Sequence, residues 1–242
     1  MRAALAGLAI VVTTLFAPGC SLIEEPAHEG PEPLVIAARA PEAPTANSVF
    51  VPVVLSTSGA AGSFYTSEMT LTNRGATTLA ITYDYVSATG AGSGRGHDDL
   101  PPGQQRVIPD AIAYLRSKGV PIPSSGNQVG TLNVSFSGLA NPSDGAVTIR
   151  TTTPVPPGAP SGRAGLAYAG LLSSQLLYRT VYLCGLRESD ADRTNVAVQN
   201  AGVDGVVTLR LTFTSGDAST TKGVAETALA PGEFRQYRLT DI

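Results

Sequence analysis

The stretch that decides the fold is residues 67–86, SEMTLTNRGATTLAITYDYV. Apolar and polar residues alternate on both sides of a break that contains Asn73 and Gly75. Alternation with a period of two is typical of a β-strand with one packed and one solvated face, and an Asn/Gly break is typical of a turn. The stretch therefore predicts a β-hairpin that buries one face.

A second copy of this pattern lies in residues 193–214, RTNVAVQNAGVDGVVTLRLTFT. Asn200 and Gly202 stand where Asn73 and Gly75 stand in the first copy. The repeated asparagines have two interpretations: contact with a ligand in both copies, or closure of a turn by hydrogen bonds to nearby backbone. A glycine two residues later in each copy favours the structural turn. Recurrence of the unit predicts two tandem modules.

The composition is that of an all-β protein. Charged residues make up 14% of the chain, below the roughly one quarter of typical soluble domains. The 26 Gly and 18 Pro favour many turns over long helices. We therefore predict two immunoglobulin-like, antiparallel β-sandwich modules. The formal net charge of −3 provides no basic face, which disfavours nucleic acid as a partner.

The repeat and the proline-rich segments predict the domain boundaries. We expect the first module at residues 48–160, a connector or last strand at 161–178, and a second, partial module at 179–242. Pro52 cannot donate to a strand ladder, so the first strand is expected at a sheet edge.

One short helix is expected in the first module, over residues 111–118, with Asp110 as its N-cap and Gly119 as its C-cap. The second copy stops at Ile242, near the place where the first copy begins this helix. The second module would then have an open edge. We expect the first module, residues 34–36 or a strand of another molecule to complete it. A truncated gene or an incomplete sequence is the alternative interpretation.

The start of the chain has the features of a signal peptide. Residues 1–19 contain one charge, an apolar run too short to span a bilayer comfortably, and small residues at the end. Residues 20–47 are rich in Pro and Glu, which favours an extended, solvated tether. The protein is therefore expected to be exported.

The small residues directly before Cys20 resemble the lipobox of bacterial lipoproteins, in which the cysteine becomes the lipid-modified N-terminus. The resemblance implies lipidation of Cys20 and anchoring in the cell envelope. The sequence departs from the family at Ala17, where leucine is usual, so an ordinary cleaved signal followed by an incidental thiol is the alternative. Ser21 after the cysteine, rather than Asp, implies sorting to the outer membrane in a host with two membranes.

The second cysteine, Cys184, lies in the apolar, strand-like run VYLC. Reactive cysteines sit in polar, electropositive surroundings, so Cys184 is expected to be a buried, inert thiol. A disulfide with Cys20 is an option only if Cys20 is not acylated.

Several short motifs recur along the body of the chain: VPVV, MTLTN and VAVQN, LPPG and LAPG, and VYLCGLRESDADRTN. With these motifs the chain resembles an uncharacterised group of exported bacterial proteins built from tandem β-sandwich repeats. The resemblance extends from about residue 49 to the C-terminus. It rests on structural motifs, so it implies a fold and no catalytic residues.

The candidates for chemistry are three consecutive residues, His97, Asp98 and Asp99, which are expected on a loop. A hydrolase would need a nucleophile elbow as well, and the sequence contains no G-x-S-x-G-like motif. Neighbouring side chains diverge, so the three residues form a poor metal chelate. The glycines of residues 89–96 lack the Lys-Ser/Thr of a phosphate loop. The sequence therefore predicts neither catalysis nor a metal or cofactor.

The expected function is that of a non-enzymatic lipoprotein of the cell envelope, which displays its sandwich modules for protein interaction or for a structural role at the surface. The expected partners are the membrane, through the N-terminal lipid, and a protein at the open edge of the second module. Carbohydrate binding or adhesion is the alternative. The chain contains no Trp, the side chain best suited to stacking on sugar faces, which counts against it.

Overall fold

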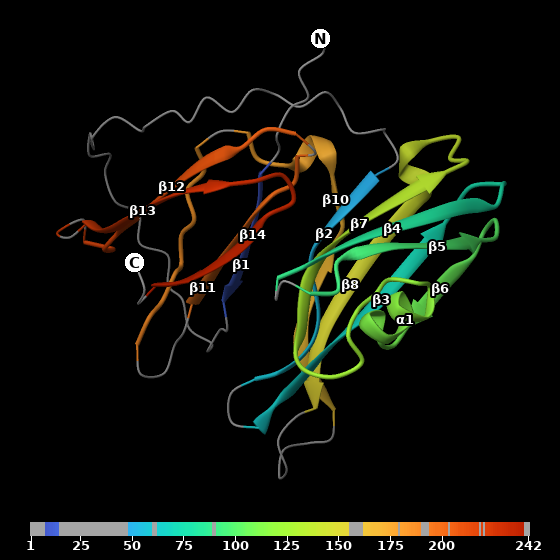
Figure 1. Cartoon of the computed structure of the whole chain (residues 1–242), viewed down its shortest axis with the longest axis horizontal. Helices are drawn as coiled ribbons and strands as arrows, with labels where there is room; N and C mark the ends of the chain where they lie inside the picture. Colours follow the sequence, from blue (N-terminus) through green and yellow to red (C-terminus); the bar gives the residue numbers. More distant parts are fainter. Residues whose placement is uncertain are drawn as a thin grey trace. The chain divides into compact units, whose positions relative to one another are not determined.

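The computed structural model forms two compact units. The larger unit comprises Glu42–Leu176, and the smaller unit comprises Met1–Pro41 together with Leu177–Ile242 (Figure 1). Cys20 and the tether at residues 20–47 lie outside the described residues. The structure describes residues 8–14, 48–59, 62–88, 91–154, 162–178, 180–189, 194–202, 204–217, 219 and 221–239.

The larger unit is an antiparallel β-structure with one short α-helix, in agreement with the predicted all-β class (Figure 1). Its main sheet has the strand order β5-β4-β7-β2-β3-β8-β9, with β10 paired to β2 and β6 paired to β3. The strands are β2 (Ser48–Ser58), β3 (Phe64–Asn73), β4 (Leu79–Ser87), β5 (Gly94–Leu100), β6 (Gln105–Ile108), β7 (Gln128–Ser137), β8 (Gly145–Pro154), β9 (Arg163–Ala169) and β10 (Leu171–Leu172).

The two strands that the sequence predicts as a hairpin do not pair with each other. β3 pairs with β8 on one side and with β2 and β6 on the other, whereas β4 pairs with β5 and β7. The break after Asn73 therefore carries the chain between two separate parts of the sheet. The period-two pattern correctly predicts strands that bury alternate residues, but it does not specify which strand lies alongside.

Strand β2 lies inside the sheet, so the edge position predicted from Pro52 is wrong. β2 pairs with β7 along most of its length, with β10 near its start and with β3 at its end. Pro52 falls where the register with β7 shifts, between Val51 and Val54. An irregular ladder at this point accommodates the missing N–H, so an internal strand tolerates the proline.

A single hydrophobic core joins the two parts of the sheet. Alternate residues of β3, β4, β7 and β8 are almost completely buried in it, and the helix adds its apolar face. Central members of this core are Met69, Leu71, Leu79, Ile81, Tyr83, Ile112, Leu115, Leu132, Val134, Phe136, Val147 and Ile149.

Helix α1 (Ala111–Ser117) forms where the sequence predicts it. The side chain of Asp110 accepts a hydrogen bond from the backbone N–H of Ala113 at 2.9 Å, which is the expected N-cap contact. Gly119 has a φ of +96°, a conformation that glycine adopts without strain at the end of a helix. No helix in the described part of the chain combines the length and apolarity that a membrane span requires.

The segment after the proline-rich stretch belongs to the larger unit. β9 (Arg163–Ala169) pairs with β8 over its whole length, and β10 pairs with Val49 and Phe50 of β2. Two short 3-10 helices, η2 (Pro142–Asp144) and η3 (Ser173–Gln175), complete the described elements of this unit.

The smaller unit contains two sets of strands. β11 (Thr194–Asn200) lies between β1 (Leu8–Thr14) and β14 (Phe234–Arg238), and β12 (Val207–Thr214) pairs with β13 (Thr221–Leu229). As in the larger unit, the strands on the two sides of the repeated asparagine do not pair with each other. Among the described residues of this unit, one buried apolar cluster comprises Val196, Val198, Leu209 and Leu229.

The run that contains Cys184 is neither a strand nor buried, so the prediction of a buried thiol is wrong. Residues 180–188 have no regular secondary structure. Cys184 is exposed and free, and Tyr182 is 82% exposed. The similar run VPVV in the larger unit lies in β2, which pairs with β7. Among its described residues the smaller unit has no strand paired to this run, so the run has no ladder to join.

Candidate functional site

The side chain of Asp98 contacts four other side chains of the larger unit, and it lies on strand β5 rather than on the predicted loop. β5 pairs with β4 over seven residues. A Cβ on Gly94 would lie 2.4 Å from Pro121 Cδ, and one on Gly96 would lie 2.8 Å from the Lys118 carbonyl oxygen. These glycines therefore permit close packing of the segment after α1, whereas in the sequence they resemble the glycines of a flexible loop.

Burial alternates along β5, so the three predicted candidates differ in how far their side chains are exposed. The side chain of Asp98 is 8% exposed, whereas His97 and Asp99 are exposed. An open hollow of about 380 Å³ is lined by these three residues together with Ala80, Ile81 and Thr82 of β4. Among the described residues, no group of three or more His, Cys, Asp and Glu side chains is placed to hold a metal ion.

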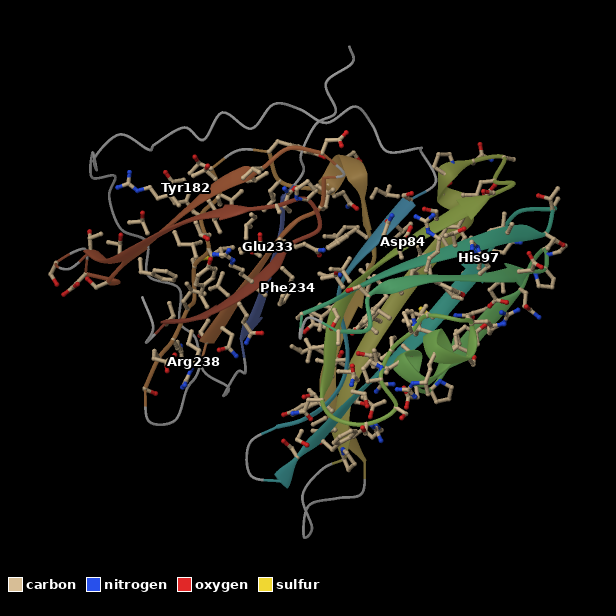
Figure 2. The ribbon with its side chains drawn as sticks, in the orientation of Figure 1. Asp84, His97, Tyr182, Glu233, Phe234 and Arg238 are labelled. Carbon is tan, nitrogen blue, oxygen red and sulfur yellow. The ribbon has the colours of Figure 1, made fainter. Side chains whose placement is uncertain are left out.

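The described hydrogen bond of the His97 side chain is to a hydroxyl. Its Nδ1 lies 3.3 Å from Thr82 Oγ1, on the neighbouring strand. Figure 2 shows His97 and Asp84 on the paired strands β4 and β5 at the surface of the larger unit. Asp84 in turn accepts a hydrogen bond from Arg95 at 2.6 Å.

Asp98 is the centre of a cluster of four other polar side chains, here called the Asp98 cluster. Its Oδ2 lies 2.6 Å from Arg106 Nη1, and its Oδ1 lies 2.9 Å from Lys118 Nζ. The hydroxyl groups of Tyr83 and Tyr114 both donate to Oδ2, that of Tyr83 at 3.3 Å. The cluster therefore connects β4, β5, β6 and the end of α1 through one carboxylate.

Electrostatics holds this carboxylate in its charged form. Burial raises the pKa of Asp98, but the hydrogen bonds from Tyr114 and Lys118 and the charge of Arg106 outweigh burial, and the net pKa is lowered. Burial raises the pKa of Tyr83, and the neighbouring Tyr114 and Asp98 raise it further. A general acid or base works best with a pKa near the working pH. The pKa of Asp98 is lowered and that of Tyr83 is raised, so both move away from the range that suits a general acid or base at neutral pH.

The aromatic rings support the same arrangement. The rings of Tyr83 and Tyr114 meet edge to face, with centroids 6.4 Å apart and an interplanar angle of 81°. Lys118 Nζ lies 5.1 Å from the centroid of the Tyr114 ring. Offset and edge-to-face contacts of this kind add to the packing energy of buried rings.

Asn73 closes the turn after β3 with its side chain. Its Oδ1 accepts from the Gly75 N–H at 2.9 Å, and its Nδ2 donates to the carbonyl oxygens of Thr77, Leu100 and Pro101 at 2.8, 2.9 and 3.0 Å. Asn73 is 1% exposed. All of its side-chain hydrogen bonds go to backbone of the same unit, which leaves this amide no free group for a ligand.

Asn200 makes equivalent contacts in the smaller unit. Its Oδ1 accepts from the Gly202 N–H at 3.0 Å, and its Nδ2 donates to the carbonyl oxygens of Gly205 and Leu229 at 2.9 and 3.1 Å. Leu229 begins the LAPG turn, as Leu100 begins the LPPG turn. The repeated asparagines therefore connect the same two turns in each unit.

The partners of Asp98 are not predicted from the sequence. Arg106, Tyr114 and Lys118 come from β6, from α1 and from its C-cap. One signal was present in the sequence: Asp98 stands two residues before the apolar Leu100, so a strand would place it on the inner face. A charged residue on an inner face needs polar partners.

Comparison with known proteins gives one distant structural similarity. No protein-family model matches the chain, and neither does any curated protein. A solved structure, "Crystal Structure of Thermotoga maritima 1070", is similar with a TM-score of 0.37 and 8% sequence identity. The match covers 52% of this chain and 93% of that one.

Proposed function

We propose that this chain is a non-enzymatic lipoprotein of the bacterial cell envelope, which displays two immunoglobulin-like sandwich modules for protein interaction or for a structural role. The observation that carries the non-enzymatic part is the Asp98 cluster. Its carboxylate is 8% exposed and is held by two cations and two tyrosine hydroxyls. The Asp98 carboxylate thus connects strands of the sheet with α1, and its oxygens are engaged by these partners.

The pairing of the strands supports two copies of one module. β3 is flanked by β6 and β8 in the larger unit, and β11 is flanked by β14 and β1 in the smaller unit. β4 pairs with β5 as β12 pairs with β13. Modules built from such strands offer loops and sheet edges to a partner, and backbone hydrogen bonds at an edge are a common means of protein recognition.

The proposed anchor is Cys20, which follows an apolar run and small residues at the start of the chain. A covalent lipid on this residue would hold the tether at the membrane and leave the modules in the aqueous compartment. Ser21 favours the outer membrane in a host with two membranes.

Acylation of Cys20 has a direct test. In a bacterial host fed labelled palmitate, the wild-type protein is expected to incorporate label and to partition into detergent, because the lipid supplies its membrane affinity. Cys20→Ala is expected to abolish both. Cys184→Ala is the matched control, since Cys184 is a second, exposed thiol, and it should leave both unchanged. Unlabelled wild-type protein in the soluble fraction would contradict the anchor.

Glycan binding is the second candidate, and one observation favours it. Tyr182 is 82% exposed and offers an aromatic face to solvent (Figure 2). A glycan array probed with the Cys20→Ser protein separates the two functions. Selective binding that is lost in Tyr182→Ala would favour the carbohydrate-binding function, whereas no binding is the result expected of a protein-interaction module.

A further inference from the structure

The strand beside β11 takes the place that β8 takes beside β3. In the larger unit, Leu71 is paired with Val147 and Met69 with Ile149. Leu71 and Met69 stand two and four residues before Asn73. This ladder covers β3 as far as the turn that Asn73 closes.

The ladder between β1 and β11 repeats this register. Val198 is paired with Ile10 and Val196 with Val12. Val198 and Val196 stand two and four residues before Asn200, so the apolar pairs fall at the same offsets from the repeated asparagine. β11 is therefore an acceptor for a strand of the β8 type. In this structure the acceptor is filled by Leu8–Thr14, which is none of the three sources expected from the sequence to complete the second module.

The next step rests on the proposed function. Leu8–Thr14 lies within residues 1–19, which a lipoprotein loses when cleavage occurs before Cys20. Cleavage would leave the seven residues of β11 with an unpaired edge next to the apolar cluster that contains Val196 and Val198. An unpaired edge beside an apolar core is a template for strand addition.

We propose that residues 34–40 of the tether, LVIAARA, replace β1 on β11 in the mature protein. These residues lie outside the described part of the chain, and the proposal rests on their sequence. They form a run of seven residues between Pro33 and Pro41, and β1 also has seven residues. Proline cannot donate to a ladder, so Pro33 and Pro41 would limit the strand to this length.

The tether run carries the same apolar residues as β1 at its first and third positions, and Ala38 in place of Val12 at its fifth. Aligned end to end, Leu34 corresponds to Leu8 and Ile36 to Ile10, the residue paired with Val198. The tether run belongs to the same chain, so its pairing with β11 would be intramolecular, with an effective concentration set by the part of the chain between them. Leu8–Thr14 thus pairs with β11 in the precursor, and residues 34–40 pair with it after cleavage.

Hydrogen exchange of the backbone amides of β11 tests whether residues 34–40 replace β1. The experiment compares the full chain with the chain from residue 20 to the C-terminus. Both carry Cys20→Ser, and exchange is followed by mass spectrometry of peptides that cover Thr194–Asn200. Both are expected to show similar protection. Ile36→Asp is expected to raise the exchange rate of these amides at least tenfold in the shorter chain, and to leave it unchanged in the full chain, where β1 is present. Ile23→Asp, in the same tether outside the run, is the matched control and should change neither.

Three results would overturn the proposal. Protection of β11 in the shorter chain that survives Ile36→Asp would show that another segment covers the edge. Absence of protection in the shorter chain without any substitution would show that the tether does not fill it. Protection that appears only with a doubling of the molecular mass would assign the strand to a second copy. These experiments use purified chains without lipid, so their outcome is independent of whether Cys20 is acylated.

Discussion

Asn73→Ala is expected to destabilise the larger unit by about 4 kcal/mol, because each buried group left without its hydrogen bond costs about 1–3 kcal/mol. The substitution removes the partner of the Gly75 N–H and of three carbonyl oxygens, among them that of Leu100, 27 residues away in sequence. The site is 1% exposed, so solvent does not readily replace these bonds. Chemical denaturation followed by circular dichroism measures the loss.

The control for this prediction is another asparagine that bonds to backbone. Asn127 Oδ1 accepts a single, exposed hydrogen bond from the Ser58 N–H at 3.0 Å. Asn127→Ala is therefore expected to cost about 1 kcal/mol or less. Asn200→Ala should affect the unfolding transition of the smaller unit and spare that of the larger unit. Equal effects of Asn73→Ala and Asn127→Ala would show that the buried amide does not stabilise the turn.

Asp98→Asn is expected to lower the unfolding free energy of the larger unit by about 2–3 kcal/mol at neutral pH, below the roughly 3–5 kcal/mol of a fully buried broken pair. The substitution keeps the shape of the side chain but leaves two cations without their carboxylate. Arg106 and Lys118 are 28% and 30% exposed, so water compensates for part of the loss.

The contribution of Asp98 also depends on pH. Because the folded protein lowers the pKa of Asp98, the contribution is fully present above the unfolded pKa of about 4 and is lost as the pH falls through the folded pKa. The stability difference between wild type and Asp98→Asn is therefore expected to shrink in acid. Urea unfolding of both proteins at neutral pH and at about pH 2 measures it.

Asp84→Asn is the matched control for Asp98→Asn. Asp84 lies 2.6 Å from Arg95, and the side chains of Asp84 and Arg95 are 35% and 64% exposed. Solvent screens an exposed ion pair of this kind, so this substitution should have little effect on stability. If the two substitutions cost the same at neutral pH, the Asp98 cluster would not stabilise the larger unit.

The strands could be predicted from sequence, and their partners could not. The alternation around Met69 and around Tyr83 predicts two half-buried strands, and both residues are fully buried. Alternation specifies which residues of a strand face inward, but the choice of neighbour depends on segments far along the chain. The partner of β3 is β8, and that of β4 is β7, so the expected hairpin is wrong.

In the candidate site, too, the sequence indicates the local contacts but not those between distant segments. A glycine two residues after Asn73 indicates the local turn, whereas the bond to the Leu100 carbonyl requires the folded chain. Gly94 and Gly96 favour a loop in the sequence, whereas the structure places them in a closely packed strand. A sequence does not distinguish the two uses of glycine. Cys184 was expected in a strand, but an apolar run becomes a strand only where a partner is present.

Both the lipid anchor and the replacement of β1 on β11 depend on where the mature protein begins, so its N-terminus is the decisive measurement. The protein is extracted from membranes of its bacterial host, and its N-terminal peptide is identified by mass spectrometry. We predict a chain that begins at Cys20 and carries a covalent lipid on that residue. A chain that retains residues 1–19, or one that begins elsewhere with an unmodified residue, would contradict the account.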